Sequence, residues 1–323
     1  MSKIPWTEKY RPNKIKDIIS QKNVVNSLCN KINNLPHLIL YGPPGTGKTS
    51  TALALGKELF GIKLYKERII ELNASDERGI NTVRDKIKKF AQNAIHISND
   101  KNSSPNYKII ILDEADSMTK DAQSALRKII EDYSNITRFI LICNYINKII
   151  DPIISRCVIY NFVPVEKKIM FETICKIAEE EKIEYTDKII HKIIRISNGD
   201  MRKSIIILQN YKYMYDKNKD INIVELNGYL RKNKILQIID SIKTKSFNDN
   251  IKIVDSLIDS GYSIEFFLER FFKYLLQDNI DDKKKSKIIF RLSEIQKKLT
   301  EGADEYIQLL DIILYTHTVL NKL

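Results

Sequence analysis

The sequence predicts an α/β domain built on a parallel sheet, followed by two smaller domains that are entirely helical. Three observations support this prediction. In the first half, short apolar runs alternate with longer segments of helical periodicity, which is typical of repeated βαβ units. The strand pattern ends near Pro164, and only helical patterns follow it. A glycine-rich loop separates the first apolar run from the first long helical segment.

Length and charge set the limits of this prediction. The chain has 323 residues, of which 43% are apolar and 29% are charged. This length is enough for two or three domains, each with its own core. The 53 Lys and Arg exceed the 41 Asp and Glu, which gives a net charge of +12. A basic balance favours a polyanionic partner such as nucleic acid, but so much lysine is equally compatible with an ordinary solvated surface.

Composition excludes several classes of protein. Four cysteines are too few for a disulfide scaffold, and no two of them have the C-x-x-C spacing of a zinc site. No apolar run reaches the roughly 18–20 residues of a membrane span. The first residues lack the apolar stretch of a secretory signal. We therefore expect a soluble intracellular protein that does not interact with a membrane.

Five short apolar runs are the candidate strands. They are residues 38–41, 69–72, 109–112, 138–143 and 158–162. All but the second are almost continuously apolar, as strands buried on both faces of a sheet should be.

Helical periodicity marks the segments between and after these strands. We expect helices over residues 24–32, 48–60, 82–94, 122–132, 166–181, 187–196 and 200–211. The pattern is again helical from about residue 225 to the end. Residues 99–106 are polar and predict a surface loop. These patterns predict three domains, over residues 1–165, 166–226 and 227–323.

The glycine-rich loop matches the phosphate-binding pattern G-x-x-x-x-G-K-[ST] at every fixed position. Its residues are Gly42, Pro43, Pro44, Gly45, Thr46, Gly47, Lys48 and Thr49, followed by Ser50. Glycines let consecutive backbone N–H groups point at phosphate oxygens. Lys48 would reach the β- and γ-phosphates of ATP, and Thr49 would hold Mg²⁺. A glycine-rich turn without function is the alternative, but it does not account for the strand before the loop and the helix after it.

Two adjacent carboxylates follow the third candidate strand. Asp113 can bind Mg²⁺ directly or through water, and Glu114 can polarise a water molecule for attack on the γ-phosphate. Carboxylates after a strand otherwise serve as helix caps. Beside a phosphate loop we prefer the catalytic interpretation for these two residues, and we expect Asp116 to be a helix cap.

Further segments give the chain a resemblance to a known family. They are residues 6–12 (WTEKYRP), 73–80 (NASDERGI), 112–119 (LDEADSMT) and 155–157 (SRC). These segments resemble the motifs of the replication factor C small subunits, the eukaryotic and archaeal clamp loaders of the AAA+ class. The resemblance continues through residues 199–202 and 302–305, and it covers essentially the whole chain.

The resemblance implies an AAA+ phosphate-loop ATPase core, a helical lid and an all-helical C-terminal collar domain, in the order of the three predicted domains. It implies a subunit of a hetero-pentamer of replication factor C subunits. That complex would use ATP hydrolysis to load the sliding clamp, PCNA, onto primer–template double-stranded DNA in replication and repair. The implied location is the nucleus.

Two other functions are alternatives. A non-hydrolysing subunit of the same complex is disfavoured by the presence of Lys48, Asp113, Glu114 and Arg156. Another AAA+ motor, such as a branch-migration helicase, would be expected to lack the SRC triplet and the collar.

The resemblance also assigns roles to single residues. Asn144 corresponds to the first sensor, which contacts the γ-phosphate and the attacking water, although a strand-end cap is an alternative. Arg202 corresponds to the second sensor. Arg156 corresponds to an arginine finger inserted into the ATP site of the adjacent subunit; a surface salt bridge is the alternative. Three residues would line the adenine pocket, namely Thr7, Arg11 and Ile19.

Cations on one helix are candidate DNA contacts. Arg84 and Lys88 are four residues apart and share a helix face. By resemblance this helix tracks the DNA backbone, with Lys148 as a further contact, while a solvated surface is the alternative. The apolar stretch 90–97 would face the clamp, unless it packs in the core.

Overall fold

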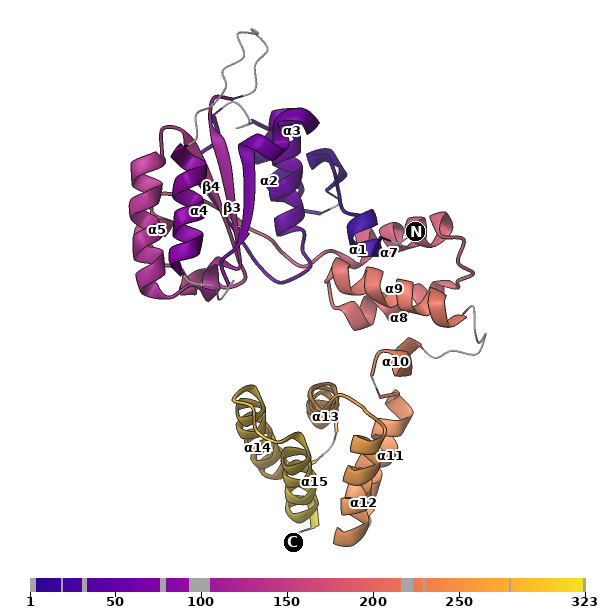
Figure 1. Cartoon of the computed structure of the whole chain (residues 1–323). Helices are drawn as coiled ribbons and strands as arrows, with labels where there is room; N and C mark the ends of the chain where they lie inside the picture. Colours follow the sequence, from indigo (N-terminus) through magenta and orange to yellow (C-terminus); the bar gives the residue numbers. More distant parts are fainter. Residues whose placement is uncertain are drawn as a thin grey trace. The chain divides into compact units, whose positions relative to one another are not determined.

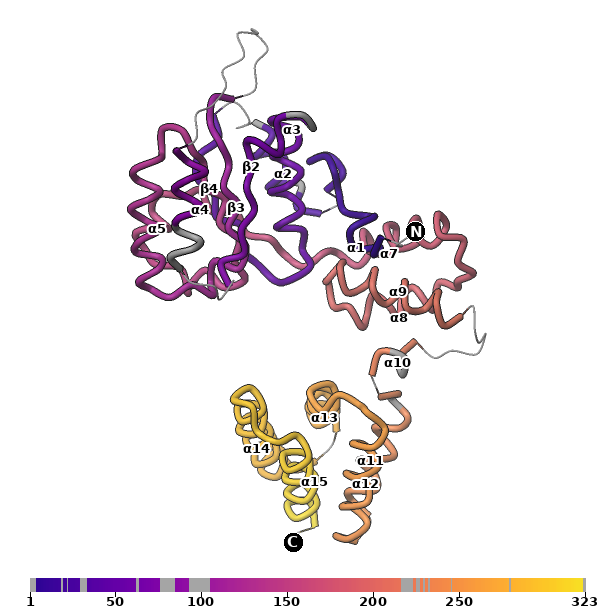
Figure 2. Tube along the Cα trace, viewed as in Figure 1, coloured from indigo at the N-terminus to yellow at the C-terminus, as the bar shows by residue number. Residues whose placement is uncertain are grey.

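A computed structural model of the chain describes residues 4–18, 20–30, 34–75, 80–92, 105–215, 223–228, 230–244, 246–278 and 280–321. The chain divides into two compact units, Met1–Lys212 and Tyr213–Leu323. Figure 1 labels their helices and strands, and Figure 2 follows the chain trace through both units.

Within the described residues of the first unit, five strands form one parallel sheet. They are β1 Leu38–Tyr41, β2 Ile69–Asn73, β3 Lys108–Asp113, β4 Thr137–Cys143 and β5 Val158–Asn161. Their order in the sheet is β2-β3-β4-β1-β5, and every pairing is parallel. The predicted strands are confirmed to within one residue at each end. Because all strands run the same way, the loops that follow them emerge at one edge of the sheet.

Four long helices cover the two faces of this sheet (Figure 1). They are α2 Lys22–Asn30, α3 Lys48–Arg68, α4 Ile80–Gln92 and α5 Lys120–Tyr133. Leu38 and Leu40 pack in one core with residues of α2 and α3. Ile39 packs in a second core with residues of α4 and α5. Alternate residues of one strand therefore pack in the cores on opposite faces of the sheet, which explains why the strands are apolar throughout.

One predicted helix extends further than expected. Helix α3 was expected over residues 48–60, and the regular helix does break there, because Gly61 has a φ of +65°. A further helical segment then continues to Arg68. The remaining short elements of the core are α1 Trp6–Lys9, η1 Ile15–Asp17, η3 Ala115–Ser117, η4 Ile146–Lys148 and α6 Asp151–Ile154.

Three helices follow the sheet, as predicted. They are α7 Lys167–Glu180, α8 Asp187–Ser197 and α9 Met201–Tyr215. Helix α8 ends at Asn198, which has the left-handed backbone conformation (φ +48°) typical of a helix C-terminus. Gly199 follows with φ +87°, and a Cβ there would lie 2.6 Å from Cβ of Pro164. The turn before α9 is thereby packed on the segment that leaves the sheet.

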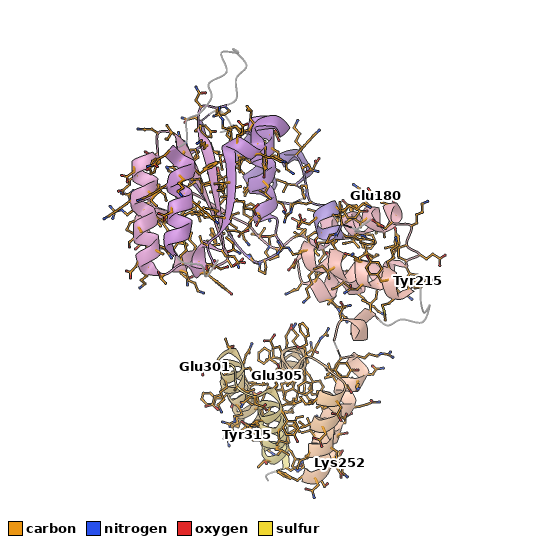
Figure 3. All side chains as sticks on the ribbon, in the orientation of Figure 1. Glu180, Tyr215, Lys252, Glu301, Glu305 and Tyr315 are labelled. Atoms are coloured by element: carbon orange, nitrogen blue, oxygen red, sulfur yellow. The ribbon has the colours of Figure 1, made fainter. Side chains whose placement is uncertain are left out.

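The second unit is helical in all its described residues. Its helices are α10 Ile223–Leu226, α11 Lys232–Thr244, α12 Phe247–Asp259, α13 Ile264–Gln277, α14 Asp282–Thr300 and α15 Glu305–Asn321. Helices α11 to α15 share one apolar core, which includes Ile239, Phe267, Phe271 and Ile312. Figure 3 shows the side chains of these helices, together with those of the first unit. None of the helices described in either unit is long and apolar enough to cross a membrane.

The three predicted domain ranges, 1–165, 166–226 and 227–323, stay a prediction. The division that the structure shows falls within α9, between residues 212 and 213.

Candidate functional site

The loop between β1 and α3 can fold as it does only because glycines occupy its tight positions. Gly42 has φ +145°, and a Cβ there would lie 2.1 Å from the carbonyl oxygen of Phe162. Gly45 has φ +69°, and its Cβ would lie 1.7 Å from a carboxylate oxygen of Asp200. Any side chain at either position would collide with its neighbour. Glycine at these two positions therefore lets the loop pack against Phe162 and Asp200.

Lys48, the first residue of α3, directs its ammonium into this loop. Its Nζ donates to the carbonyl oxygens of Gly42 (2.7 Å) and Pro43 (2.8 Å) and to Oδ1 of Asn144 (3.0 Å). The side chain is buried, and this burial lowers the pKa of Lys48, while the Asp113 carboxylate opposes the shift. The charge of Lys48 thus lies where a phosphate group would be held.

A hydroxyl and a carboxylate meet beside Lys48. Thr49 Oγ1 donates to Oδ2 of Asp113 at 2.8 Å, so the end of β3 and the start of α3 are in direct contact. The backbone N–H of Glu114 donates to Oδ1 of Asp113 at 2.8 Å. Glu114 itself is exposed. Hydroxyl and carboxylate oxygens are the ligands that Mg²⁺ takes, so the donor set fits this ion.

Asp116 is not a helix cap, and that prediction was wrong. The η3 turn carries its carboxylate back to the end of β4, where Oδ2 accepts the N–H groups of Asn144 and Tyr145, each at 3.1 Å. Helix α5 is instead capped by Thr119, whose Oγ1 accepts the Ala122 N–H at 3.3 Å. Asp116 therefore fixes the backbone that carries the Asn144 amide.

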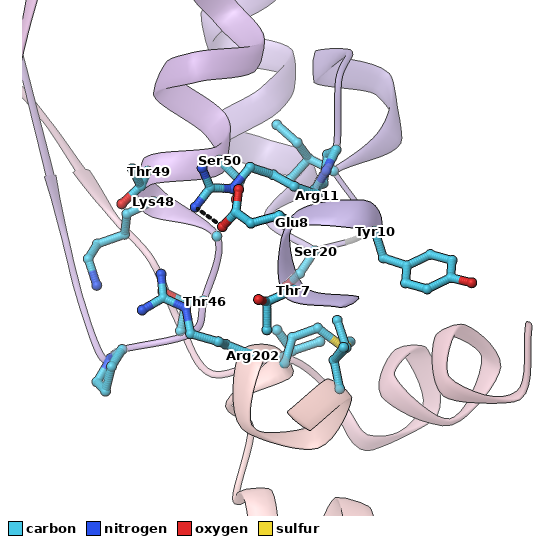
Figure 4. Close-up of a pocket in the computed structure, with 18 of the residues that line it drawn as sticks. Thr7, Glu8, Tyr10, Arg11, Ser20, Thr46, Lys48, Thr49, Ser50 and Arg202 are labelled. Atoms are coloured by element: carbon cyan, nitrogen blue, oxygen red, sulfur yellow. Dashed lines mark ion pairs between the residues drawn. The ribbon is translucent and has the colours of Figure 1, made fainter. Parts of the chain in front are cut away.

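The helices after the sheet close the other side of the site. The N–H of Met201 donates to the carbonyl oxygen of Gly45 at 3.1 Å, so α9 begins in contact with the phosphate loop. Arg202, the next residue, lines the pocket. Figure 4 shows its guanidinium directed toward the side of the pocket that holds Lys48.

These parts enclose a pocket of about 310 Å³. Most of the predicted site residues line it, namely Thr7, Arg11, Pro44, Gly45, Thr46, Gly47, Lys48, Thr49, Ser50, Asp113, Glu114, Asn144 and Arg202. Gly42 and Pro43 are not among the lining residues, but their carbonyl oxygens accept the hydrogen bonds of Lys48. Ile19 lies outside the described residues, between Ile18 and Ser20, which both line the pocket.

The N-terminal segment forms one wall of the pocket. Thr7, Glu8, Tyr10 and Arg11 all line it. An ion pair between Arg11 Nη2 and Glu8 Oε1 (3.1 Å), drawn dashed in Figure 4, holds the Arg11 side chain along this wall.

Sequence reasoning missed several lining residues. Thr173 and Ile177 of α7 and Met201 and Ile205 of α9 face the pocket. Each pair is four residues apart, the spacing of one helix face. That periodicity was visible in the sequence, but it does not distinguish a face that lines a pocket from one that packs in a core.

Arg156 does not line this pocket. Its Nη2 pairs with Oε1 of Glu131 at 2.6 Å, and its Nη1 donates to the carbonyl oxygen of Pro152 at 2.6 Å. Glu131 also pairs with Arg127, and the hydrogen bond from Arg127 is the main cause that lowers the pKa of Glu131, with Arg156 adding to it. Within its own chain, Arg156 is thus a surface residue in an ion pair.

Of the candidate DNA contacts, Lys88 and Lys148 do not line the pocket either. Lys88 is half-buried on α4, and Lys148 is exposed, with its ammonium 5.2 Å from the ring centre of Tyr145. Arg84 belongs to α4, but its side chain is outside the described part of the structure. Residues 93–97 of the apolar stretch also lie outside it.

Three family models match consecutive parts of the chain. The model of the "ATPase family associated with various cellular activities (AAA)" matches residues 38–165. The model named "RCF1/5-like, AAA+ ATPase lid domain" matches residues 172–212. The model named "Replication factor C C-terminal domain" matches residues 230–315.

Individual relatives match almost the whole chain. Replication factor C subunit 2 of Oryza sativa is 43% identical over 95% of this chain and 92% of its own length. Replication factor C subunit 4 of Homo sapiens is 42% identical, over 96% and 86% of the two chains. Subunit 4 of Arabidopsis thaliana is 42% identical over 99% and 96%. Residues 138–145 and 302–305 lead us to expect subunit 4 in particular, but the relatives carry the numbers 2 and 4 alike and do not distinguish the two.

Solved structures share the fold at much lower identity. The RuvB Holliday junction branch migration motor of Thermotoga maritima matches with a TM-score of 0.53 and 19% identity, over 81% of this chain and 91% of that one. At this identity the match supports the AAA+ fold alone.

Proposed function

The chain belongs to the replication factor C small-subunit family, and from this premise we propose that it is an ATP-hydrolysing subunit of a clamp loader. One observation supports the proposal most directly. The phosphate loop, Asp113, Asn144 and Arg202 come from the sheet and from the lid, and they line a single pocket. A nucleotide held there would contact both parts of the ATPase at once.

We infer the following roles within the chain. The phosphate loop and Lys48 would bind the β- and γ-phosphates of ATP. Thr49 and Asp113 would hold Mg²⁺, which neutralises phosphate charge when it is bound. Glu114 would accept a proton from the attacking water, and the Asn144 amide would orient that water. Arg202 would bring positive charge from the lid to the γ-phosphate.

Arg156 is proposed to act in the site of the adjacent subunit. Its planar guanidinium can stabilise the charge of a transferring phosphoryl group. The pair that it forms with Glu131 is exposed, and exposed ion pairs contribute little to stability. Arg156 can therefore leave Glu131 at small cost when a neighbouring nucleotide is present.

The proposed partners are the other replication factor C subunits of a hetero-pentamer, the sliding clamp PCNA and primer–template double-stranded DNA, in the nucleus. Nearly all of the net charge of +12 lies in residues 1–212, which agrees with DNA contact by that unit. Arg84, Lys88 and Lys148 are proposed to contact the DNA backbone.

The test is to reconstitute the complex and measure ATP turnover with and without clamp and primed DNA. We expect clamp and DNA to stimulate turnover. Lys48→Ala should abolish hydrolysis at this subunit's site. Arg156→Ala should lower hydrolysis at the adjacent site by about 10³-fold, the range found for arginine fingers.

Arg127→Ala is the matched control, because Arg127 pairs with the same Glu131 carboxylate. It should leave stimulated turnover unchanged. If Arg156→Ala behaves like Arg127→Ala, the assignment of Arg156 is wrong. If clamp and DNA do not stimulate the wild-type complex, the clamp-loader proposal fails.

A further inference from the structure

One carboxylate, Glu181, connects the N-terminal helix α1 to two helices of the lid. Glu181 follows the last residue of α7, and its side chain is 12% exposed. Its Oε1 accepts hydrogen bonds from Lys9 Nζ (2.5 Å) and Tyr10 Oη (2.9 Å). Lys212 of α9 donates to Oε2 (3.1 Å) and to the Glu181 carbonyl oxygen (2.7 Å). Three donors thus converge on the end of α7, from Lys9 of α1, from Tyr10 directly after α1, and from Lys212 of α9.

Trp6 makes a second connection between α1 and the lid. Its side chain is 6% exposed. Its backbone N–H donates to Oε1 of Gln209 on α9 at 3.3 Å. The Lys212 ammonium lies 5.4 Å from the centre of the indole ring, within the range of a cation–π contact. The Tyr10 ring meets the indole edge-on, with their centres 6.2 Å apart.

The other end of this N-terminal segment is anchored in the sheet domain. Ile15 is fully buried in the core beneath α2 and α3, and its N–H donates to Oε2 of Glu58 at 3.2 Å. The segment from Trp6 to Ile15 therefore joins the lid to the sheet domain. This link adds to the covalent connection through Pro164 and Val165 and to the hydrogen bond between Met201 and Gly45.

The same segment forms a wall of the nucleotide pocket. Thr7 and Arg11 line the pocket, and Figure 4 shows the Tyr10 ring extending away from the phosphate loop. Thr173 and Ile177, which also line the pocket, lie on α7, the helix that ends at Glu181. The Glu181 contacts therefore hold together two walls of the pocket, the N-terminal segment and α7.

The electrostatics of Glu181 agree with this geometry. Burial by itself would raise the pKa of this carboxyl group. The hydrogen bonds from Lys9, Lys212 and Tyr10 outweigh burial and lower the pKa of Glu181 to about 2. The carboxylate is charged at neutral pH, so its bonds to the two lysines are charge-assisted.

We propose that Glu181 is a positioning residue for nucleotide binding, which holds α1 on the lid so that the pocket wall formed by Thr7 and Arg11 moves with α7 and α9. The proposal rests on the proposed nucleotide site. Loss of the Glu181 contacts would leave the phosphate loop intact. It would weaken only the wall formed by Thr7 and Arg11, which in the proposed nucleotide site would hold the nucleoside.

The test uses the full chain and two ligands, Mg·ADP and tripolyphosphate. Trp6 is the only tryptophan of the chain, so tryptophan fluorescence reports on α1 alone. In Glu181→Gln we expect ADP to bind about tenfold more weakly, as for the loss of a charge-assisted hydrogen bond. Tripolyphosphate affinity should be unchanged. Acrylamide should quench Trp6 more strongly than in the wild type, and saturating ADP should restore its protection.

Glu180→Gln is the matched control, because Glu180 is the adjacent residue and is exposed (labelled in Figure 3). It should match the wild type in every measurement. Lys212→Gln removes the α9 side of the network without touching the pocket lining. It should change ADP affinity and Trp6 quenching in the same direction as Glu181→Gln. If Glu181→Gln does not fold, the Lys212→Gln measurements test the proposal instead.

Two results would overturn the proposal while leaving the nucleotide site in place. One is an ADP affinity equal to that of the wild type in Glu181→Gln, or in Lys212→Gln if Glu181→Gln does not fold. The other is an equal loss of ADP and tripolyphosphate affinity, which would indicate a general structural role. If the wild-type chain binds neither ligand, the nucleotide site itself is wrong, and this proposal fails with it.

Discussion

The Asp116 carboxylate holds the end of β4 through the N–H groups of Asn144 and Tyr145. Asn144 in turn accepts a hydrogen bond from Lys48. Asp116 thus sets the position of the Asn144 amide, and it is this amide that contacts Lys48 in the phosphate loop. Two backbone donors share one carboxylate oxygen, so removal of the carboxylate leaves both without that partner.

We predict that Asp116→Ala lowers kcat for ATP hydrolysis by about tenfold, with little change in ADP affinity. The loss of one or two hydrogen bonds corresponds to roughly this factor. ADP affinity should persist because the phosphate loop is untouched. Steady-state turnover in the reconstituted complex and ADP titration of the chain measure the two quantities. Asp116→Asn, which keeps an acceptor oxygen, should recover most of the rate; equal rates for the two variants would contradict the prediction.

At the scale of elements, helix α3 positions the site because Lys48 and Thr49 form its first turn. The helix lies close to β2 at Gly56, where a Cβ would be 2.1 Å from Cδ1 of Ile69. The absence of a side chain at Gly56 therefore allows α3 to pack against the first residue of β2. Alanine favours a helix more than glycine does. At position 56 it is the packing against Ile69 that disfavours alanine.

We predict that Gly56→Ala destabilises the first unit by up to about 2 kcal/mol, since overpacking costs more than alanine gains in helix propensity. Ile69→Val removes the Cδ1 atom that would collide. By itself it should cost about 1 kcal/mol. The double variant Gly56→Ala/Ile69→Val should be more stable than the sum of the two single effects predicts. Urea unfolding followed by Trp6 fluorescence measures the free energy of unfolding of all three variants. If the effects of the two single substitutions simply add in the double variant, the contact between position 56 and Cδ1 of Ile69 is not the cause of the destabilisation.

At the scale of the whole molecule, the sheet and the helices from Leu230 onward have different hydrophobic cores. The sheet cores draw on residues between Ile15 and Phe162, and the C-terminal core on residues between Leu230 and Ile313. All residues that line the nucleotide pocket belong to the first unit. Ligand binding should therefore stabilise one unit directly and not the other.

We predict two transitions in thermal unfolding, of which Mg·ADP raises only one. At a ligand concentration of 100 times Kd the stabilisation is about 2.7 kcal/mol. For a unit of this size, that corresponds to roughly 5–10 °C in Tm. Calorimetry measures both transitions, and Trp6 fluorescence identifies that of the first unit. Lys48→Ala should abolish the shift, whereas an equal shift of both transitions would contradict the prediction.

Much of this protein follows from local sequence. The strands could be predicted because residues such as Ile110 and Leu141 must be apolar on a sheet covered on both faces. The phosphate loop could be predicted because its backbone requires glycine at Gly42 and Gly45. The roles of Arg156 and of Arg84, Lys88 and Lys148 stay predictions, because the ligands proposed for them would belong to other molecules.

Local sequence determined the order of strands and helices, the phosphate loop and the carboxylates beside it, because these features depend on neighbours a few residues apart. Tertiary structure alone decided the rest. The contacts of Asp116 with β4, of Glu181 with Lys9 and Lys212, and of Met201 with Gly45 join residues far apart in the chain. A hydrogen bond depends on distance and direction in space, and for such pairs only the packing of the helices on the sheet and on one another sets these two quantities.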